Sequence, residues 1–179
     1  MWAQDAAGEV AASMTVPAWR AKDGLMTFQK LPGGTRGARI PPSNAVTRAL
    51  NRVAMSWHRR SGDKFQGQDL LYLTTVGAKT GQKRHTAVAR FPDGEDAWLV
   101  VASAAGSAHH PAWYHNLAAH PDQVWIEFGG RQLHVTPTQL DGEARAQAWQ
   151  RITQSQPRYA GYERKTDRAI PVIRLSRAD

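Results

Sequence analysis

The strongest constraint on the fold is a set of short apolar runs joined by turns too short for parallel crossovers. Residues 124–128 are apolar at every second position, and a Gly129-Gly130 pair leads from them into a second such run. An Asp93-Gly94 pair stands before another apolar run, and both pairs tolerate the positive φ angles of hairpin turns. Because parallel strands need a crossover of a dozen or more residues, these turns predict a largely antiparallel sheet.

Helical spacing of apolar residues predicts helices between and around these strands. Ser43 is a plausible N-cap for the first, Pro111 stands in the first turn of the second, and Asp141 can cap the third. The expected helices cover about 44–60, 111–119 and 143–153, and further strands cover 70–76, 84–91, 97–102 and 170–175. This order predicts an α+β chain in which a small, mostly antiparallel β-barrel carries peripheral helices.

The length of the chain and its local composition predict the domain organisation. A chain of 179 residues has the usual size of one domain. Residues 1–42 are rich in proline and glycine and have little periodicity, so we expect a loosely ordered N-terminal extension there. The domain proper is expected at 43–179, beginning with the helix 43–60.

Composition narrows the classes of function. The absence of cysteine excludes disulfides, thiolate metal sites and a cysteine nucleophile. The sequence has no apolar run long enough for a membrane span and no pattern of a secretory signal, so we expect a soluble, cytoplasmic protein.

The charge of the chain points to an anionic partner. A net charge of +8 favours a phosphorylated ligand, nucleic acid or an acidic membrane. The helix 43–60 collects Arg48, Arg52 and Arg59 on one face. That face is either solvated or in peripheral contact with the inner face of a membrane.

Two segments have the chemistry of an anion site. In the first, Gly77 and Gly81 bound a turn that carries Lys79 and Thr80 and is followed by Arg84. Inward-pointing N–H groups with a basic rim suit a phosphate or carboxylate, although an ordinary exposed turn has the same pattern. The spacing is not that of a P-loop, and no helix follows it.

The second segment runs from Ser103 through small residues into the expected helix at 111–119. The start of a helix presents free N–H groups to an anion, and Trp113 and Tyr114 could flank a planar ring. Alternatively, Trp113 and Leu117 are the buried stripe of that helix.

Other candidate groups carry less information. Tyr159 and Tyr162 are three residues apart, so they can meet on one side of a helical turn, where they pack, stack or donate a proton. His110, His115 and His120 are spaced by five and do not share a helix face, so no metal site is expected. The sequence also lacks the Gly-x-Ser-x-Gly pattern of a serine hydrolase.

Taken together, these segments resemble the deazaflavin-dependent nitroreductase and quinone reductase family, whose members use coenzyme F-420 on a split β-barrel. The matching residues, in order between about 65 and 176, are 73–81, Lys83-Arg84, Ser103, Gly106, 110–117, Tyr159, Tyr162, 166–168 and Ile170-Pro171. The resemblance implies an α+β fold on a mostly antiparallel split β-barrel with peripheral helices. It also implies that the cofactor's phosphate and oligoglutamate tail is the anionic partner.

The resemblance implies roles for individual residues. Tyr159 and Tyr162 match aromatic residues beside the substrate pocket, and Ser103 matches the loop near the deazaflavin ring. These three are the expected catalytic residues, with Ser103 and Tyr159 as candidates for orienting the electron acceptor or supplying a proton. The cofactor is expected to contact Ala78, Lys79, Thr80, Arg84, His85, Thr86, Ala87, Val88, Ala89, Val101, Ala102, Ser103, Ala104, Ala112, Trp113, Tyr114, His115, Asn116 and Tyr159. Family members that activate nitroimidazoles carry a tyrosine where this chain has Gln156, which favours a quinone or another conjugated acceptor.

The implied activity is hydride transfer from C5 of the reduced deazaflavin to an electron-poor small molecule, such as a quinone, an enone or a nitroaromatic. Two alternatives on the same barrel are a carrier that holds a cofactor or lipid without turning it over and a relative that uses FMN. Nucleic acid is not an expected partner, because the sequence has no recognition helix, zinc module or RNA-binding signature.

Overall fold

The computed structural model describes residues 28–39, 62–65 and 67–178. The strands are β1 (Lys64–Phe65), β2 (Gln68–Val76), β3 (Lys83–Ala89), β4 (Phe91–Pro92), β5 (Ala97–Val101), β6 (Val124–Phe128), β7 (Arg131–Gln139) and β8 (Val172–Arg177), and the helices are η1 (Ala104–Gly106), α2 (Ala112–Ala119), α3 (Gly142–Ser155) and α4 (Arg158–Lys165). The helix expected at 43–60, with its three arginines, lies outside the described residues, as does most of the expected extension. Within the described part of the chain, no helix is long and apolar enough to cross a membrane.

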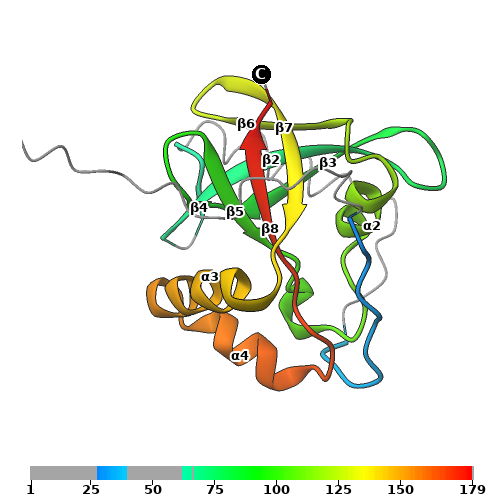
Figure 1. The fold of residues 1–179 in the computed structure, drawn as a ribbon, viewed down its shortest axis with the longest axis vertical. Coiled ribbons are helices and arrows are strands. Elements are labelled where there is room, and N and C mark those ends of the chain that lie inside the picture. Colours follow the sequence, from blue (N-terminus) through cyan, green and yellow to red (C-terminus); the bar gives the residue numbers. More distant parts are fainter. Residues whose placement is uncertain (1–27, 40–61, 66, 179) are drawn as a thin grey trace, which may run out of the picture.

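The described strands form one curled sheet in which every pair is antiparallel. The strand order is β1-β2-β6-β7-β8-β5-β4, and β3 also pairs with β2. Both hairpins form as the turn residues predicted: Gly94 has φ +92° between β4 and β5, and Gly129 and Gly130 have φ +55° and +71° between β6 and β7. The result is the predicted α+β chain with an antiparallel, barrel-like sheet (Figure 1).

The core has two parts that share β5. Trp98 and Val100 belong to a cluster enclosed by the curled sheet and α2. Leu99 and Val101 belong to a second cluster, which α3 and α4 cover at one end of the sheet (Figure 1). Successive side chains of a strand point to opposite faces, so a strand that is buried on both faces needs the continuously apolar sequence that β5 has.

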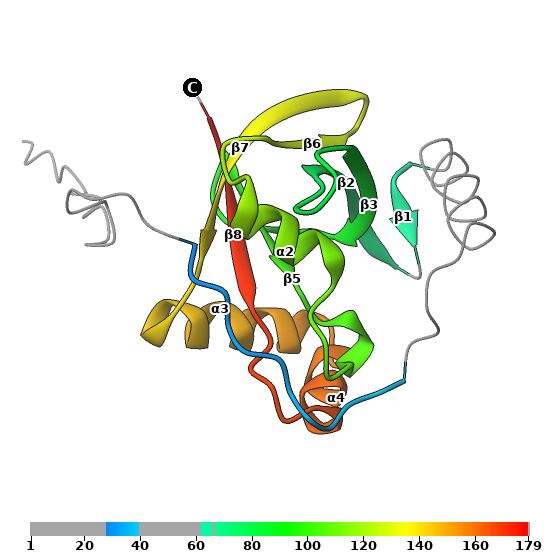
Figure 2. The same ribbon diagram turned by 90° about the vertical axis from the view of Figure 1, so that its right-hand side faces the viewer.

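Residues 28–39 form an extended segment, here called the N-terminal strap, that runs past α2 towards α4 (Figure 2). The Gly34 amide donates to the Ala108 carbonyl at 2.8 Å, and the Ala38 amide donates to the Gly106 carbonyl at 2.8 Å. We expected a loosely ordered extension over 1–42, but this part of it is hydrogen-bonded to the domain along its length. Its backbone bonds are made to residues far away in the sequence, which periodicity does not detect.

Candidate functional site

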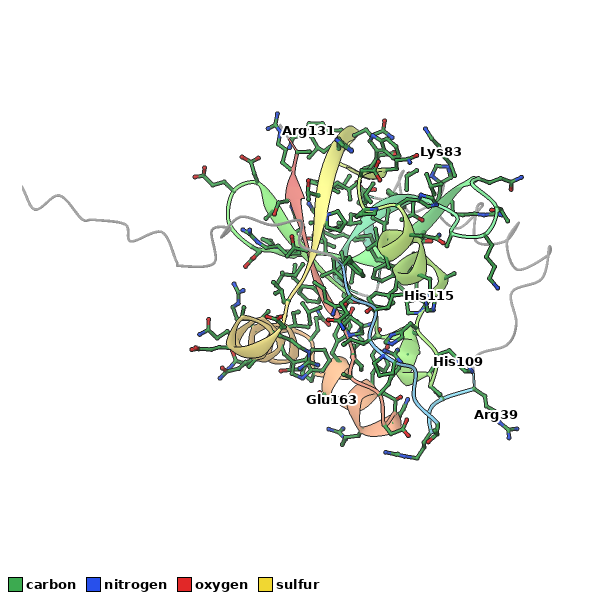
Figure 3. The ribbon with its side chains drawn as sticks, turned by 45° about the vertical axis from the view of Figure 1, so that its right-hand side comes forward. Arg39, Lys83, His109, His115, Arg131 and Glu163 are labelled. Carbon is green, nitrogen blue, oxygen red and sulfur yellow. The ribbon has the colours of Figure 1, made fainter. Side chains whose placement is uncertain are left out.

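A cleft of about 1090 Å³ opens between the β2–β3 turn and α2. This volume lies slightly above the usual range for small-molecule sites, about 300–1,000 Å³, and suits an elongated ligand. His115 of α2 is one of the residues on its wall (Figure 3). The lining residues are Lys30, Gly77, Ala78, Lys79, Thr80, Gln82, Arg84, His85, Thr86, Ala112, Trp113, His115, Asn116, Ala118 and Ala119.

The β2–β3 turn is held in shape by its own backbone. The Gly77 amide donates to the Gln82 carbonyl at 2.9 Å, and the Gly81 amide donates to the Gly77 carbonyl at 2.8 Å. A Cβ on Gly77 would lie 2.7 Å from Oγ1 of Thr80, so a side chain at this position would have to displace Thr80. The Arg84 guanidinium donates to Oε1 of Gln82 at 3.2 Å, which keeps its charge over the turn.

Asn116 joins the two walls of the cleft. Its side-chain oxygen accepts from the Ala78 amide at 3.0 Å, and its amide group donates to Oγ1 of Thr75 at 3.0 Å. Asn116 is 7% exposed, and buried polar groups of this kind cost free energy when they lose their partners. The side chain therefore fixes α2 against the end of β2 and the start of the turn.

The cleft is electropositive. Its lining includes Lys30, Lys79 and Arg84 and contains no Asp or Glu among the described residues. Burial lowers the pKa of His115, and the charges of Lys30 and Lys79 lower it further. Near neutral pH the imidazole is therefore uncharged, and the three cations define a site for an anionic ligand.

Behind α2, a buried guanidinium organises the loop between β5 and α2. Arg168 is 5% exposed, and it donates to the carbonyls of Ala102 at 3.0 Å and of Ser103 and Ser107 at 2.8 Å. It also donates to Nδ1 of His110 at 3.0 Å. Burial lowers the pKa of this guanidinium, while the carbonyls that surround it provide acceptors for the buried charge.

The structure brings together just over half of the cofactor-binding residues expected from the sequence. Ten of them line the cleft, namely Ala78, Lys79, Thr80, Arg84, His85, Thr86, Ala112, Trp113, His115 and Asn116. They come from the two segments that the sequence singled out as anion sites, together with the start of β3. The Gly-bounded turn is therefore part of a concave site and is not an isolated exposed turn.

The other expected residues lie elsewhere. Ala87, Val88 and Ala89 continue along β3, while Val101, Ala102, Ser103 and Ala104 belong to β5 and the loop that Arg168 holds. Tyr114 is fully buried; its hydroxyl donates to Oε1 of Gln139 at 2.6 Å and accepts from the Leu31 amide at 2.9 Å. None of these residues lines the cleft.

Tyr159 and Tyr162 also lie away from the cleft. They meet on one side of α4, with ring centroids 5.6 Å apart, as their spacing predicted. Tyr159 is buried in the second core cluster, edge-on to Phe91 at 5.6 Å, and burial raises the pKa of its hydroxyl. Gln68 lies beside the Tyr159 hydroxyl, and Nζ of Lys165 lies 5.7 Å from the centroid of the Tyr162 ring. Both tyrosines thus pack within the domain, which is one of the alternatives that the sequence left open.

Lys30 is the lining residue that sequence reasoning missed most clearly. It lies on the strap, more than forty residues before the turn it faces. The composition around it, rich in glycine and proline, gave no signal of a fixed position, because long-range hydrogen bonds place the strap.

The chain matches a known protein family over most of its length. The model of a family described as F-420H(2)-dependent quinone reductase matches residues 46–176. This range contains the β2–β3 turn, α2 and the loop between β5 and α2 that Arg168 holds. The chain belongs to this family. The resemblance drawn from the sequence motifs is thereby confirmed: this family member is an oxidoreductase whose cofactor is coenzyme F-420.

Similar proteins agree with this assignment. An F-420H(2)-dependent quinone reductase of Mycobacterium tuberculosis is 44% identical over 110 residues, which make up 60% of this chain and 72% of that protein. A solved structure described as an F-420-H2-dependent reductase is 37% identical, with a TM-score of 0.54 over 60% of this chain and 93% of that chain. Another, described as a domain-swapped dimer, is 32% identical, with a TM-score of 0.55 over 74% of this chain and all of that chain. The expected split β-barrel of the family is thus confirmed.

The cleft of this quinone reductase family member fits the cofactor in charge and size. A deazaflavin with a phosphate and an oligoglutamate tail is long and strongly anionic, and the cleft combines a large volume with three cationic side chains. Phosphate and carboxylate groups are the ligands that such side chains bind best.

Proposed function

We propose that this chain binds reduced coenzyme F-420 in the cleft between the β2–β3 turn and α2 and passes its hydride to a quinone-type acceptor. The observation that carries the proposal is the electropositive lining, in which Lys79 and Arg84 come from the Gly-bounded turn and Lys30 comes from the strap. Lys79 and Arg84 at the turn neutralise the phosphate, and Trp113 and Asn116 form the opposite wall. Asn116 keeps the two walls at a fixed separation through its bonds to Thr75 and Ala78.

The protein's contribution to the reaction is binding, orientation and exclusion of water. Reduced F-420, when bound, supplies the hydride. Arg84 and Lys79 hold the anionic part, so that the ring is presented to the acceptor in one orientation. We also propose that Ser103, Tyr159 and Tyr162 orient the acceptor or supply a proton. Only the family resemblance supports these roles, because the described contacts of the three residues are with the β5–α2 loop and the second core cluster.

A fluorescence titration with F-420, run beside FMN, tests the proposal. We expect tight binding of F-420, weak binding of FMN, and oxidation of the reduced cofactor when a quinone is added. A preference for FMN would assign the chain to the flavin-using alternative. Binding of F-420 without turnover across a broad panel of acceptors would assign it to the carrier alternative.

Replacement of Arg84 tests the position of the site. Arg84→Ala removes a charge-assisted contact worth about 1.5–3 kcal/mol, so the dissociation constant for F-420 should rise by about tenfold to a hundredfold with the unfolding midpoint unchanged. Arg131→Ala, on an exposed arginine at the far hairpin (Figure 3), is the matched control. Equal affinities of the two variants would contradict the proposed site.

We propose a quinone, in preference to a nitroimidazole, as the acceptor. Gln156 stands where nitroimidazole-activating members carry a tyrosine, and it lies at the junction of α3 and α4, where its carbonyl accepts from the Tyr159 amide at 3.1 Å. Steady-state rates with a menadione-type quinone and with a nitroimidazole, measured at the same cofactor concentration, test this preference. A higher specificity constant for the nitroimidazole would reverse it.

We also propose a cytoplasmic enzyme that touches the inner face of the membrane through the helix expected at 43–60. Arg48, Arg52 and Arg59 on one face would bind anionic lipid, and apolar quinones partition into the same bilayer. Sedimentation with vesicles of phosphatidylglycerol should carry the protein down, and vesicles of phosphatidylcholine should not. Unchanged sedimentation after reversing the three charges to glutamate would contradict this contact.

A further inference from the structure

The N-terminal strap precedes the residues that the family model matches. The match begins at residue 46, and the strap covers residues 28–39. The strap therefore lies outside the matched range, and its role follows from its own contacts.

One end of the strap is anchored by Asp167. The Asp167 carboxylate accepts from the amide and hydroxyl of Thr35 at 3.0 and 2.6 Å, and from the Arg36 amide at 3.0 Å. These bonds lower the pKa of Asp167 to about 2, so the carboxylate stays charged throughout the physiological range. The neighbouring Thr166 hydroxyl donates to the Arg36 carbonyl at 3.0 Å.

The other end of the strap rests on α2. The ring of Phe28 lies 5.4 Å from that of Tyr114, whose hydroxyl accepts from the Leu31 amide at 2.9 Å. The carbonyl of Pro32 accepts from Nε2 of His110 at 3.0 Å. Lys30 lies between these contacts, so its backbone is fixed on both sides.

The position of Lys30 gives the strap a role in the cleft. Its side chain lines the cleft together with Lys79, Ala112 and His115, and its charge is one of the two that lower the pKa of His115. Lys30 thus adds a third cation from a segment outside the matched range. The cations of the family segments lie on the turn, whereas Lys30 approaches from the α2 side.

We infer that the strap is a wall of the cofactor cleft and that Lys30 binds an acidic group of F-420, with Asp167 as a positioning residue. This inference rests on the proposed function of the cleft and extends it. The shared chemistry is an anionic oxygen on phosphate or on the glutamate carboxylates, since an ammonium group binds either one. The strap thereby makes affinity depend on the charged tail of the cofactor as well as on its ring.

The first experiment compares Lys30→Gln with Arg39→Gln, whose side chain projects from the same strap away from the body of the protein (Figure 3). Each variant is titrated with three ligands: polyglutamylated F-420, the form that carries phosphate without glutamates, and the deazaflavin nucleoside that lacks both. Lys30→Gln should lower the affinity for polyglutamylated F-420 by about threefold to tenfold, and Arg39→Gln should leave that affinity unchanged.

The three ligands identify the group that Lys30 binds. A loss of affinity for both phosphate-bearing forms would show that Lys30 binds the phosphate. A loss of affinity confined to the polyglutamylated form would show that it binds the glutamate carboxylates. An equal loss with the nucleoside, or no loss at all, would overturn the inference. Wild-type protein that binds no F-420 would overturn the proposed function as well, whereas intact wild-type binding with an unaffected Lys30→Gln variant would overturn the inference alone.

The second experiment releases the strap without touching Lys30. A Cβ on Gly37 would lie 2.6 Å from the carbonyl carbon of Ser107, whereas a Cβ on Gly33 would meet only the Ala108 carbonyl at an ordinary 3.5 Å. Gly37→Ala should therefore expose the strap to limited proteolysis and lower the affinity for F-420 as much as Lys30→Gln does. Gly33→Ala should have neither effect. The pair controls for the chemical change, since both replace glycine by alanine.

A double variant tests whether the strap acts through Lys30. In the Lys30→Gln background, Gly37→Ala and Asp167→Ala should add no further loss of F-420 affinity, because the group that the strap positions is already gone. Asp167→Asn keeps one acceptor oxygen and should restore part of the affinity that Asp167→Ala loses. Additive losses would overturn the inference, because they would mean that the strap acts on the cofactor by another route.

Discussion

At the scale of single residues, the hydrogen bonds of Arg168 determine the state of His110. An arginine only donates, so Nδ1 of His110 must be the acceptor of its 3.0 Å bond. The proton of the neutral ring then lies on Nε2 and is donated to the Pro32 carbonyl at 3.0 Å. One imidazole thus connects the buried guanidinium to the strap, and it can do so only while it is neutral.

This geometry predicts an acid-sensitive stability. Burial lowers the pKa of His110 below its usual 6.5, and the charges of Arg168 and His115 lower it further. Because the unfolded state then binds the proton more readily than the folded state, the free energy of unfolding should fall as pH drops below about 6.5 and level off below the lowered pKa. Urea unfolding at a series of pH values between about 7.5 and 5 measures this slope.

Three variants separate His110 from the other histidines. His110→Gln should flatten the slope, and the part that remains should disappear in the double variant with His115→Gln, because burial lowers the pKa of that ring as well. His109→Gln, at the exposed neighbouring position, controls for the loss of an imidazole. A slope that is equally steep in His110→Gln and in the wild type would contradict the assignment.

At the scale of elements, the loop between β5 and α2 is strained where it meets α4. Ala104 and Ala105 have φ angles of +44° and +49°, a left-handed conformation that costs a residue with a Cβ about 1–2 kcal/mol. Gly106 follows at φ +81°, and a Cβ there would lie 2.7 Å from the Tyr162 carbonyl oxygen. The bonds from Arg168 and the contact with α4 hold this loop in its conformation.

Replacement of alanine by glycine should therefore affect the free energy of unfolding differently in this loop and in a helix. Ala105→Gly relieves the left-handed strain, so we expect the free energy of unfolding to stay constant or rise by up to about 1 kcal/mol. Ala146→Gly, at an exposed position within α3, should lower it by about 1 kcal/mol. Urea denaturation measures both, and a loss of stability in Ala105→Gly as large as that in Ala146→Gly would contradict the strain.

The elements that the sequence predicted are those with local signals. β6 is recognised from its alternating apolar residues and the glycine pair that follows, and β5 is recognised from its continuous apolar run. Both patterns involve only residues that are neighbours in the chain. The strap depends on Ala108 and Asp167, which are distant in sequence, and periodicity does not report such contacts. For the same reason the sequence could find Lys79 and Arg84 on their Gly-bounded turn but not Lys30, and it could not decide which side of α4 would pack on Phe91.

At the scale of the whole molecule, the net charge of +8 and the cations of the cleft act on the same ligand. A positive protein attracts an anionic cofactor at long range and holds it at short range. Salt screens such interactions, with a Debye length of about 10 Å at 0.1 M. A ligand without charged groups experiences neither effect.

The affinity for F-420 should therefore depend on salt in proportion to the charge of the tail. We expect the dissociation constant of polyglutamylated F-420 to rise by about tenfold between about 0.05 and 0.5 M sodium chloride, and that of the deazaflavin nucleoside to change by less than about twofold. Arg84→Ala should reduce the slope for F-420, because one of the charges that the salt screens is absent, whereas Arg131→Ala should reduce it only slightly. Parallel slopes for the two ligands would mean that the ring alone determines affinity, and the cations of the cleft would then need a different explanation.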